Sequence, residues 1–231
     1  MNKILQFLKK AILGIIISIF TIGLSVIAGL NLTFIYSYSI DKYKLDAIVN
    51  LSKDSLLNDY YNLIYYLQNP FIKKLEFNNF PMSTNGEFHF YEVKKIFLGI
   101  YLILLISIGI FLLYHFITKR RGREFKIYNL LNYGANTLIV FLTTLLLSIY
   151  IDFSKAFTLF HKIFFNNDYW LFDERTDPII KVLPEEVFKL YALIILFFIF
   201  IAIISYKAFY LRNRNSYEIR KDSDNNIKSE G

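Results

Sequence analysis

The chain has 231 residues, of which 55% are hydrophobic, 19% aromatic and 19% charged, with no cysteine and a net charge of +7. A soluble domain has about a quarter charged residues, so these totals alone are only mildly unusual. The absence of cysteine excludes disulfides and thiolate chemistry within the chain. The distribution of the charges is more informative, because long apolar stretches exclude a disordered or fibrous protein.

Four windows contain no Asp, Glu, Lys or Arg: residues 11–40, 96–118, 127–151 and 190–206. A helix needs about 20 apolar residues to cross the hydrocarbon core of a bilayer, and each window reaches or nearly reaches this length. The sequence therefore predicts an all-α membrane protein with four transmembrane helices in a single membrane domain, residues 1–231. The expected spans are residues 11–36, 96–118, 127–151 and 190–210.

The basic residues indicate how these helices are oriented. Lysines and arginines outnumber acids before the first window and in the short loop 119–126, whereas the long loops 37–95 and 152–189 have balanced or slightly acidic charge. By the positive-inside rule, both termini, the loop 119–126 and the tail 211–231 face the cytoplasm, and the two long loops are structured and extracytoplasmic. The net positive charge is then a sign of topology and not of nucleic-acid binding.

The N-terminal apolar run could instead belong to a secretory signal peptide. It is much longer than the usual apolar region of about 7–15 residues and lacks a small-x-small cleavage site. We therefore expect an uncleaved first helix.

The first long loop contains a predicted amphipathic helix. Apolar residues recur at helical spacing over residues 56–67, Asp54 is the expected N-cap, and Asn69-Pro70 is a stop signal. Such a helix would pack on the bundle or lie at the lipid surface.

The second long loop begins with aromatic residues at the spacing of one helical face: Phe153, Phe157, Phe160, Phe164 and Phe165. This face is expected to lie in the membrane interface. Trp170, the only tryptophan, follows among acidic residues, at the depth where tryptophan anchors prefer to lie. A connector would not need so many specific polar and aromatic residues, so the loop is predicted to form a site.

The three histidines differ in their expected depth. His115 is expected near the cytoplasmic end of the second span, whereas His89 and His161 are expected at the outer boundary, from different loops. Imidazole is the side chain that changes charge near neutral pH. Two imidazoles at one depth can therefore serve as a general acid and a general base.

Other chemistries leave weaker signals. The sequence has no zincin, P-loop or dinucleotide-binding motif, so neither a nucleotide nor a metal is expected. A zinc site from His89, His161 and Asp168 is an alternative without a ligand-spacing signature. A hydroxyl nucleophile, Thr158 beside His161, would make a membrane acyl hydrolase. A further alternative is a non-enzymatic bundle that binds a membrane protein through residues 152–188.

Two stretches resemble the lipoprotein intramolecular transacylases (Lit) of Gram-positive bacteria. The first is Gly86-x-x-His89-Phe90-x-Glu92-Val93-Lys94-x-Ile96-Phe97. The second is Phe160-His161-x-Ile163-Phe164-Phe165-x-Asn167-Asp168-x-Trp170-x-x-Asp173-x-x-x-Asp177-Pro178, followed by Leu183-Pro184-Glu185-x-x-Phe188. The four-span layout is also similar, and the resemblance covers nearly the whole chain. One departure is Glu174, where a proline is expected after Asp173.

The resemblance implies an acyltransferase of the bacterial cell membrane that acts on diacylglyceryl-modified lipoproteins. It would move the sn-2 acyl chain to the α-amino group of the same N-terminal cysteine, giving a lyso-form lipoprotein, with an active site at the outer leaflet. By the same resemblance, His89 and His161 are the catalytic pair. Membrane lipid is an expected partner, whereas a cofactor, a nucleotide and nucleic acid are not. The residues expected to bind or orient the substrate are Glu92, Lys94, Asn167, Asp168, Trp170, Asp173 and Asp177.

This chemistry agrees with the residue types. An α-amine has a pKa of roughly 7.7–8.0 and imidazole one of about 6.5, so a histidine can accept the proton of the amine. The sequence leaves open which histidine is the base, and whether an imidazole attacks directly to form an acyl-histidine. The three aspartates could also cap turns or pair with Arg175 or Lys162.

Overall fold

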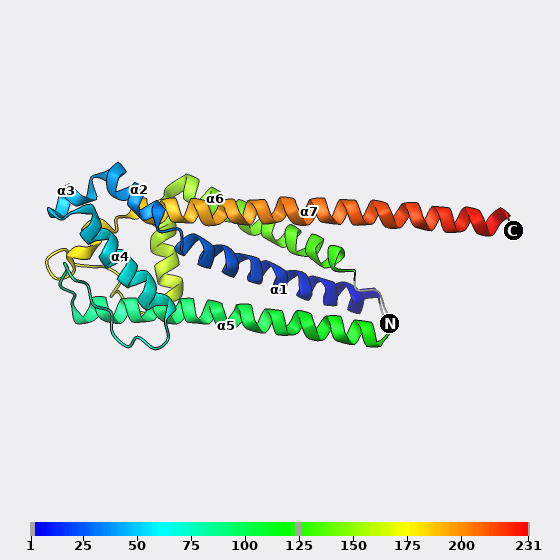
Figure 1. The fold of residues 1–231 in the computed structure, drawn as a ribbon, viewed down its shortest axis with the longest axis horizontal. Coiled ribbons are helices and arrows are strands. Elements are labelled where there is room, and N and C mark those ends of the chain that lie inside the picture. The colour runs from blue at the N-terminus through cyan, green and yellow to red at the C-terminus, as the bar shows by residue number, and fades with distance from the viewer. Residues whose placement is uncertain (1–2, 123–125, 231) are drawn as a thin grey trace. The chain divides into compact units, whose positions relative to one another are not determined.

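The computed structural model describes residues 3–122 and 126–230, so residues 123–125 of the predicted loop 119–126 lie outside it. The described residues form helices and no β-strand, which confirms the predicted all-α class. In chain order the elements are α1 (Lys3–Leu30), α2 (Phe34–Tyr43), α3 (Leu45–Val49), α4 (Lys53–Gln68), α5 (Thr84–Arg120), α6 (Ile127–Phe164), the 3₁₀ helix η1 (Pro178–Val182) and α7 (Glu185–Glu230) (Figure 1).

Four of these helices contain segments long and apolar enough to cross a membrane: Phe7–Leu30, Thr84–Arg120, Ile127–Phe164 and Glu185–Asn215. A helix satisfies its own backbone N–H and C=O groups, which is why charge-free windows fold as helices in lipid. Large apolar side chains such as Leu112, Val140 and Phe197 are exposed along these helices, as contact with lipid tails requires. The protein is therefore an integral membrane protein with four transmembrane helices.

The helices differ from the predicted spans at their ends. α1 ends at Leu30, before the predicted end of the span at residue 36, and the side-chain amide of Asn31 donates back to the Ile27 carbonyl at 2.8 Å. α5 begins at Thr84 and not at residue 96, so the segment that carries the first histidine is already helical.

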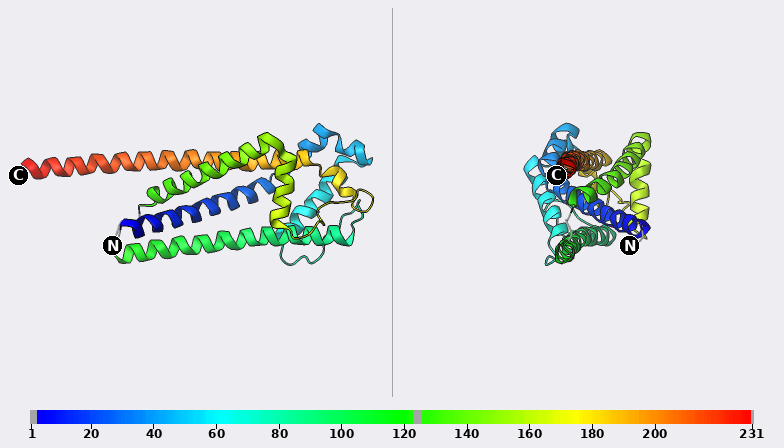
Figure 2. Two further views of the ribbon diagram at one scale, coloured as in Figure 1. Left: turned by 180° about the vertical axis from the view of Figure 1, so that it is seen from behind. Right: turned by 90° about the vertical axis from the view of Figure 1, so that its right-hand side faces the viewer.

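α6 contains a kink where the third span was predicted to end. Asp152 has non-helical backbone angles (φ −165°, ψ 101°), and its carboxylate accepts a hydrogen bond from the Lys155 backbone N–H at 3.0 Å. The residues after the kink, 153–164, form the helix that the aromatic spacing predicted. In Figures 1 and 2 the axis of this segment runs crosswise to the axis of the first part of α5.

The chain divides into two compact units, of which one comprises the described residues of 1–22, 104–144 and 197–231. In this unit α1 and α6 approach closely at Gly134, where an added Cβ would lie 2.7 Å from the Ile17 side chain. The Ser18 hydroxyl donates to the Gly134 carbonyl at 3.0 Å. Small residues of this kind allow the backbones of membrane helices to pack closely.

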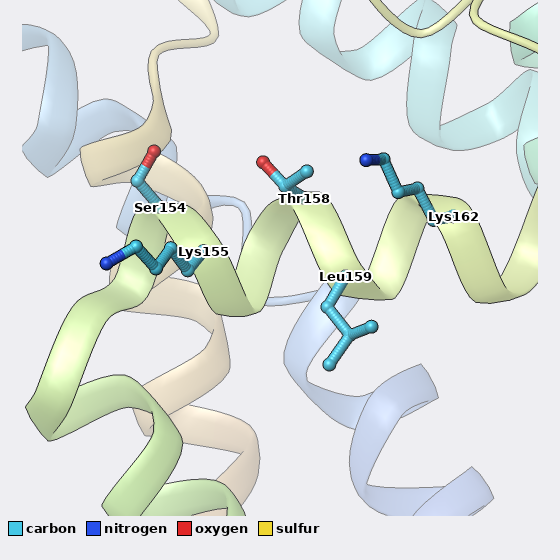
Figure 3. A pocket seen from close by; sticks show the side chains of 5 residues that line it. All are labelled: Ser154, Lys155, Thr158, Leu159 and Lys162. Atoms are coloured by element: carbon cyan, nitrogen blue, oxygen red, sulfur yellow. The ribbon is translucent and has the colours of Figure 1, made fainter.

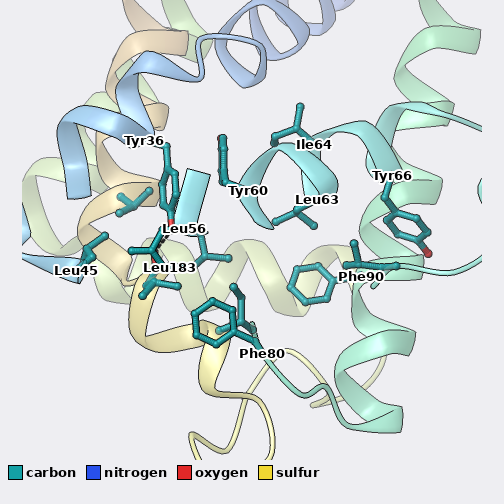
Figure 4. Packing of buried hydrophobic residues seen from close by; sticks show 14 of the residues in the cluster. Tyr36, Leu45, Leu56, Tyr60, Leu63, Ile64, Tyr66, Phe80, Phe90 and Leu183 are labelled. Carbon is teal, nitrogen blue, oxygen red and sulfur yellow. Dashed lines mark hydrogen bonds between the residues drawn. The ribbon is translucent and has the colours of Figure 1, made fainter. Parts of the chain in front are cut away.

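The other unit comprises residues 23–103 and 145–196 and contains the candidate site. Its core is an apolar cluster in which the Tyr36 ring stacks on the Tyr60 ring at 4.1 Å between centroids (Figure 4). The Tyr36 hydroxyl donates to the Val182 carbonyl at 3.0 Å and so joins α2 to η1. Phe90 belongs to the same cluster, which therefore anchors the first turns of α5.

The predicted amphipathic helix of the first long loop is α4. Its N-cap is Ser52, whose hydroxyl accepts a hydrogen bond from the Ser55 N–H at 3.1 Å, so the prediction of Asp54 as the cap was wrong. Asp54 lies in the first turn, where a negative charge suits the helix dipole. On the buried face, the Asp59 carboxylate accepts from the backbone N–H groups of residues 78–79 at 2.6 and 3.2 Å, which fixes the following loop to α4.

Candidate active site

The second unit brings His89 and His161 together. His89 lies on the first turns of α5, and His161 lies on α6 after the kink. The ring centroids are 6.0 Å apart, with the ring planes inclined by 33°. Both side chains are buried, with exposed fractions of 7% and 8%. Two histidines that the sequence placed at one depth are thus neighbours in the fold.

Aromatic side chains enclose the pair on the His89 side. Phe165 packs against both imidazoles, with its ring centroid 4.7 Å from that of His89 and 5.6 Å from that of His161. Phe172 meets the His89 ring edge-on at 5.5 Å. These rings give the pair apolar neighbours on that side and contribute to its burial.

The His161 ring lies between two further aromatic side chains. The Phe157 ring centroid is 4.2 Å away, and the Trp170 ring system stacks on the imidazole at 4.6 Å with an angle of 28°. Phe157 and Phe165 belong to the aromatic face that the sequence assigned to the membrane interface. In the structure these two members of the face contact the histidines.

The backbone fixes the tautomer of His161. Its Nδ1 atom lies 2.7 Å from the carbonyl oxygen of Phe157, one helical turn earlier. A carbonyl oxygen can only accept, so Nδ1 carries the proton and donates it. In the neutral ring the free lone pair is therefore on Nε2, which is the atom able to accept a proton from a substrate.

Both imidazoles lie outside the charge-free windows 96–118 and 127–151, and burial shifts their ionisation. Desolvation, followed by the neighbouring His161, lowers the pKa of His89 to about 4. Desolvation also lowers the pKa of His161, although its bond to the Phe157 carbonyl and the charge of Glu185 oppose this shift. Both shifts favour the neutral ring, the form in which an imidazole accepts a proton.

Two of the predicted orienting residues connect the second long loop to α5. The Asn167 side-chain amide donates to the Glu92 carboxylate at 3.0 Å, and its carbonyl oxygen accepts from the Tyr169 N–H, also at 3.0 Å. Glu92 follows His89 by three residues on α5. This pair of bonds therefore fixes the segment before Trp170 relative to the first histidine.

Asp177 holds the start of α5. Its carboxylate is buried and accepts from the Ser83 N–H at 2.7 Å and from the Thr176 hydroxyl at 2.8 Å. The Ser83 hydroxyl in turn accepts from the Gly86 N–H at 3.0 Å, as an N-cap does. A Cβ on Gly86 would lie closer than 3.0 Å to Oδ1 and 3.1 Å from Cγ of Asp177, so glycine permits this approach.

The other three predicted residues are held away from the pair. Asp168 is exposed, and Asp173 is exposed and paired with the Arg175 guanidinium at 2.6 Å, the local pairing that the sequence left open. Lys94 is buried, but its ammonium donates to the Ile72 carbonyl. Within the described ranges, no hydrogen bond or ion pair joins any of the three to either histidine.

The structure does not support the alternative of a zinc site. Among the residues that the structure describes, no group of three or more His, Cys, Asp or Glu side chains is placed to hold a metal ion. His89, His161 and Asp168 are therefore not assembled as ligands.

The hydroxyl-nucleophile alternative has no geometric support either. Thr158 lines a shallow pocket on α6, beside Ser154 and Lys162 (Figure 3). The Nδ1 atom of His161 is occupied by the Phe157 carbonyl. In the described part of the chain, no hydrogen bond joins Thr158 to His161.

The predicted site residues did not include Glu185 or Phe172, nor Phe157 and Phe165, which the sequence assigned to the membrane interface. Glu185 is the first residue of α7; it accepts from the Ser154 hydroxyl at 3.0 Å, and its charge raises the pKa of His161. Glu185 belongs to the second stretch that resembles the Lit family, but as the acid that follows a proline it resembled an ordinary residue in the first turn of a helix. Phe172 carried no signal, because its contact with His89 joins residues far apart in the chain.

Comparisons with known proteins show the family of the chain. The family model for the lipoprotein intramolecular transacylase Lit matches residues 11–188. A solved structure of the membrane integral lipoprotein intramolecular transacylase Lit from Bacillus cereus is similar, with a TM-score of 0.84 and 32% identity over 94% of this chain and 100% of that one. Another structure of that protein, with one histidine replaced by alanine, gives a TM-score of 0.76 and 32% identity over 95% of this chain and 100% of that one. A comparison with curated proteins gave no match. The chain belongs to the lipoprotein intramolecular transacylase (Lit) family.

Proposed function

We propose that this protein moves the sn-2 acyl chain of a diacylglyceryl-modified lipoprotein to the α-amino group of the same N-terminal cysteine, with His89 and His161 as the catalytic pair. Membership of the Lit family supports acyl transfer on a lipoprotein. One observation carries the specific chemistry: two imidazoles lie 6.0 Å apart in an aromatic enclosure, and the Phe157 carbonyl leaves Nε2 of His161 free to act as a base.

His161 is the base for the amine in this proposal. An α-amine with a pKa of roughly 7.7–8.0 is mostly protonated in water at pH 7 and is not nucleophilic in that form. Burial disfavours the charged form of an amine, so the apolar enclosure helps it to lose a proton. The neutral Nε2 atom of His161 is available to receive the next proton as the amine attacks.

The transfer balances without a cofactor. The amine nitrogen gives its electron pair to the ester carbonyl carbon, forming the C–N bond, and the carbonyl π pair moves to oxygen. Nitrogen then loses a proton to Nε2 of His161, this proton passes to the neutral His89 ring, the bond from the carbonyl carbon to the glyceryl oxygen breaks, and His89 delivers the proton to this oxygen, so both rings end neutral. One N–H and one C–O bond are replaced by one O–H and one C–N bond. The low pKa of His89 keeps its ring neutral until it receives this proton, and it makes the protonated ring a strong donor to the glyceryl oxygen.

Positioning contributes more than proton transfer. General acid and base groups contribute about 10²–10⁴-fold in rate, whereas holding the two reacting groups together can be worth an effective molarity of about 10⁵–10⁸ M. Ester and amine already belong to one molecule, so the site needs only to fold the lipid back on its peptide. The charge distribution further supports cytoplasmic termini and an active site at the outer leaflet of the membrane.

Single substitutions of the histidines test the proposal. His161→Asn keeps a donor for the Phe157 carbonyl but has no base at the position of Nε2, and His89→Ala removes the second ring. Each should leave the protein in the membrane and lower acyl migration by at least about 10²-fold. His115→Ala, which changes the third histidine, is the matched control and should be active.

The readout is mass spectrometry of lipoprotein N-terminal peptides from a host that lacks N-acylation. Full activity of both variants would reject the histidine pair. An unchanged lipid state with the unaltered protein would favour the non-enzymatic binding bundle. Loss of activity in Thr158→Ala alone would favour a hydroxyl nucleophile, and an acyl adduct on His161 in the intact protein would favour direct attack by the imidazole.

A further inference from the structure

Two buried polar atoms at the site have no hydrogen-bond partner in the described part of the chain: Nδ1 of His89 and Nε1 of Trp170. A neutral imidazole nitrogen can be a donor or an acceptor, but an indole N–H can only donate. A buried donor without an acceptor is costly, and such groups are rare in folded proteins. The Trp170 N–H is therefore a donor for which the described residues supply no acceptor.

The tryptophan is held in a defined place. Its ring system stacks on the His161 imidazole at 4.6 Å, so the indole lies beside the proposed base. The segment before it is fixed by the bonds from Asn167 to the Glu92 carboxylate and from the Tyr169 N–H to Asn167. An interface anchor needs its N–H in contact with headgroups or water, whereas this N–H is buried.

We propose that the Trp170 N–H binds the carbonyl oxygen of the acyl ester and stabilises the negative charge that this oxygen acquires during transfer. This assignment rests on the proposed function. When the amine attacks, the carbonyl π pair moves to oxygen, and the resulting oxyanion accepts a hydrogen bond from Nε1. When the C–O bond to glycerol breaks, the pair returns to form the amide carbonyl, and the same donor releases the product.

The chemistry favours this acceptor over the others that the substrate offers. The amine needs its lone pair for the attack on the ester, so a hydrogen bond from an N–H to this pair would oppose the reaction, and the glyceryl oxygen gains its proton from the catalytic pair. Among the reacting atoms, the carbonyl oxygen alone gains negative charge that a fixed N–H donor can stabilise. A donor aimed at developing charge in a water-excluded site is worth about 10²–10³-fold in kcat.

The composition makes an atom-specific test possible. Because Trp170 is the only tryptophan, replacing all tryptophan by benzothienylalanine changes this position alone. The analogue keeps the bicyclic shape but has a sulfur atom in place of the N–H. With a diacylglyceryl-cysteinyl peptide as substrate, kcat should fall by about 10²–10³-fold while KM changes less than about threefold. The pH profile of the residual activity should stay unchanged, because His161 keeps its stacking partner.

Two comparisons keep the result interpretable. Trp170→Phe retains an aromatic ring without an N–H and should lose kcat to a similar extent, so it replaces the analogue if the latter does not fold. Tyr169→Phe, at the exposed neighbouring residue, is the matched control and should have normal kcat. A fall in kcat of less than about threefold, or a loss confined to KM, would overturn the assignment while the proposed function stands. If the unmodified enzyme makes no N-acylated product, the proposed function fails, and this assignment fails with it.

Discussion

Replacing Gly86 by alanine should displace the buried Asp177, and the loop that carries it, from the start of α5. A Cβ at this position would lie closer than 3.0 Å to Oδ1 and 3.1 Å from Cγ of Asp177. Heavy atoms in good contact are about 3.5–4.0 Å apart, so the neighbours must separate by roughly 1 Å. Asp177 is only 3% exposed and is held by the Ser83 N–H at 2.7 Å. The shift therefore strains or breaks this hydrogen bond.

Two effects of the substitution can be sized from this geometry. Hydrogen bonds to charged groups contribute about 1.5–3 kcal/mol, so Gly86→Ala should lower the free energy of unfolding by an amount in this range. A displacement of about 1 Å in a catalytic arrangement can cost 10²-fold in rate. Gly86 lies one turn before His89 on α5, so acyl transfer should fall by roughly 10–100-fold.

The assay is thermal unfolding in detergent together with acyl transfer. Gly99→Ala is the matched control, because it lies on the same helix with nothing within 4 Å of the added Cβ. It should cost no stability, since alanine favours a helix over glycine by about 1 kcal/mol. In the double variant Gly86→Ala/Asp177→Ala the clash with the Asp177 carboxylate is absent and only the contact with Met82 at 3.3 Å remains, so the two losses should fall short of additivity by at least about 1 kcal/mol. Additive losses, or a Gly86→Ala protein as stable and active as Gly99→Ala, would refute the reasoning.

Three further outcomes are expected. Trp170 fluorescence should be quenched on acidification, because the stacked His161 ring becomes charged. The midpoint should lie below pH 6.5, since burial lowers the pKa of this ring. His161→Gln should abolish the transition, and a midpoint at or above pH 6.5 would contradict the burial argument. In Glu185→Gln the same midpoint should move to lower pH, because the charge that raises the pKa of His161 is gone. Asp59→Ala should lower the free energy of unfolding by about 2–4 kcal/mol in a detergent melt, because the N–H groups of residues 78–79 lose their acceptor. A loss below about 0.5 kcal/mol would mean that water replaces the Asp59 carboxylate as the acceptor.

The membrane helices could be predicted from the sequence because lipid allows few alternatives. A charge-free window in hydrocarbon has to pair its backbone groups internally, and periodic aromatic residues after Asp152 gave the helical face 153–164 correctly. The helix ends were predicted less well, since single side chains decide them. The Asn31 side chain bonds to the preceding turn where α1 ends, and Ser52 rather than Asp54 caps α4. The hydropathy of a sequence does not predict such local hydrogen bonds.

Contacts between residues far apart in the chain could not be predicted from the sequence either. The common depth of the two histidines followed from topology, but their aromatic neighbours did not. Asp173 and Asp177 stand four residues apart in one acidic stretch and looked equivalent. In the fold, Asp173 pairs with Arg175 at the surface, whereas Asp177 is buried against the Ser83 N–H. Ser83 is distant in sequence, so only the packed structure distinguishes the two aspartates.

The burial of the histidine pair has opposing effects on the proposed reaction, and their balance explains the enclosure. Desolvation lowers the pKa of both rings, which weakens each as a base. The same desolvation keeps both rings neutral at pH 7, destabilises the protonated form of the substrate amine and strengthens any hydrogen bond to a developing oxyanion. It also keeps water away from an ester that water would hydrolyse. Since the acyl chain must reach nitrogen and not water, an aromatic enclosure around two weak bases favours transfer more than a solvated pair of stronger bases would.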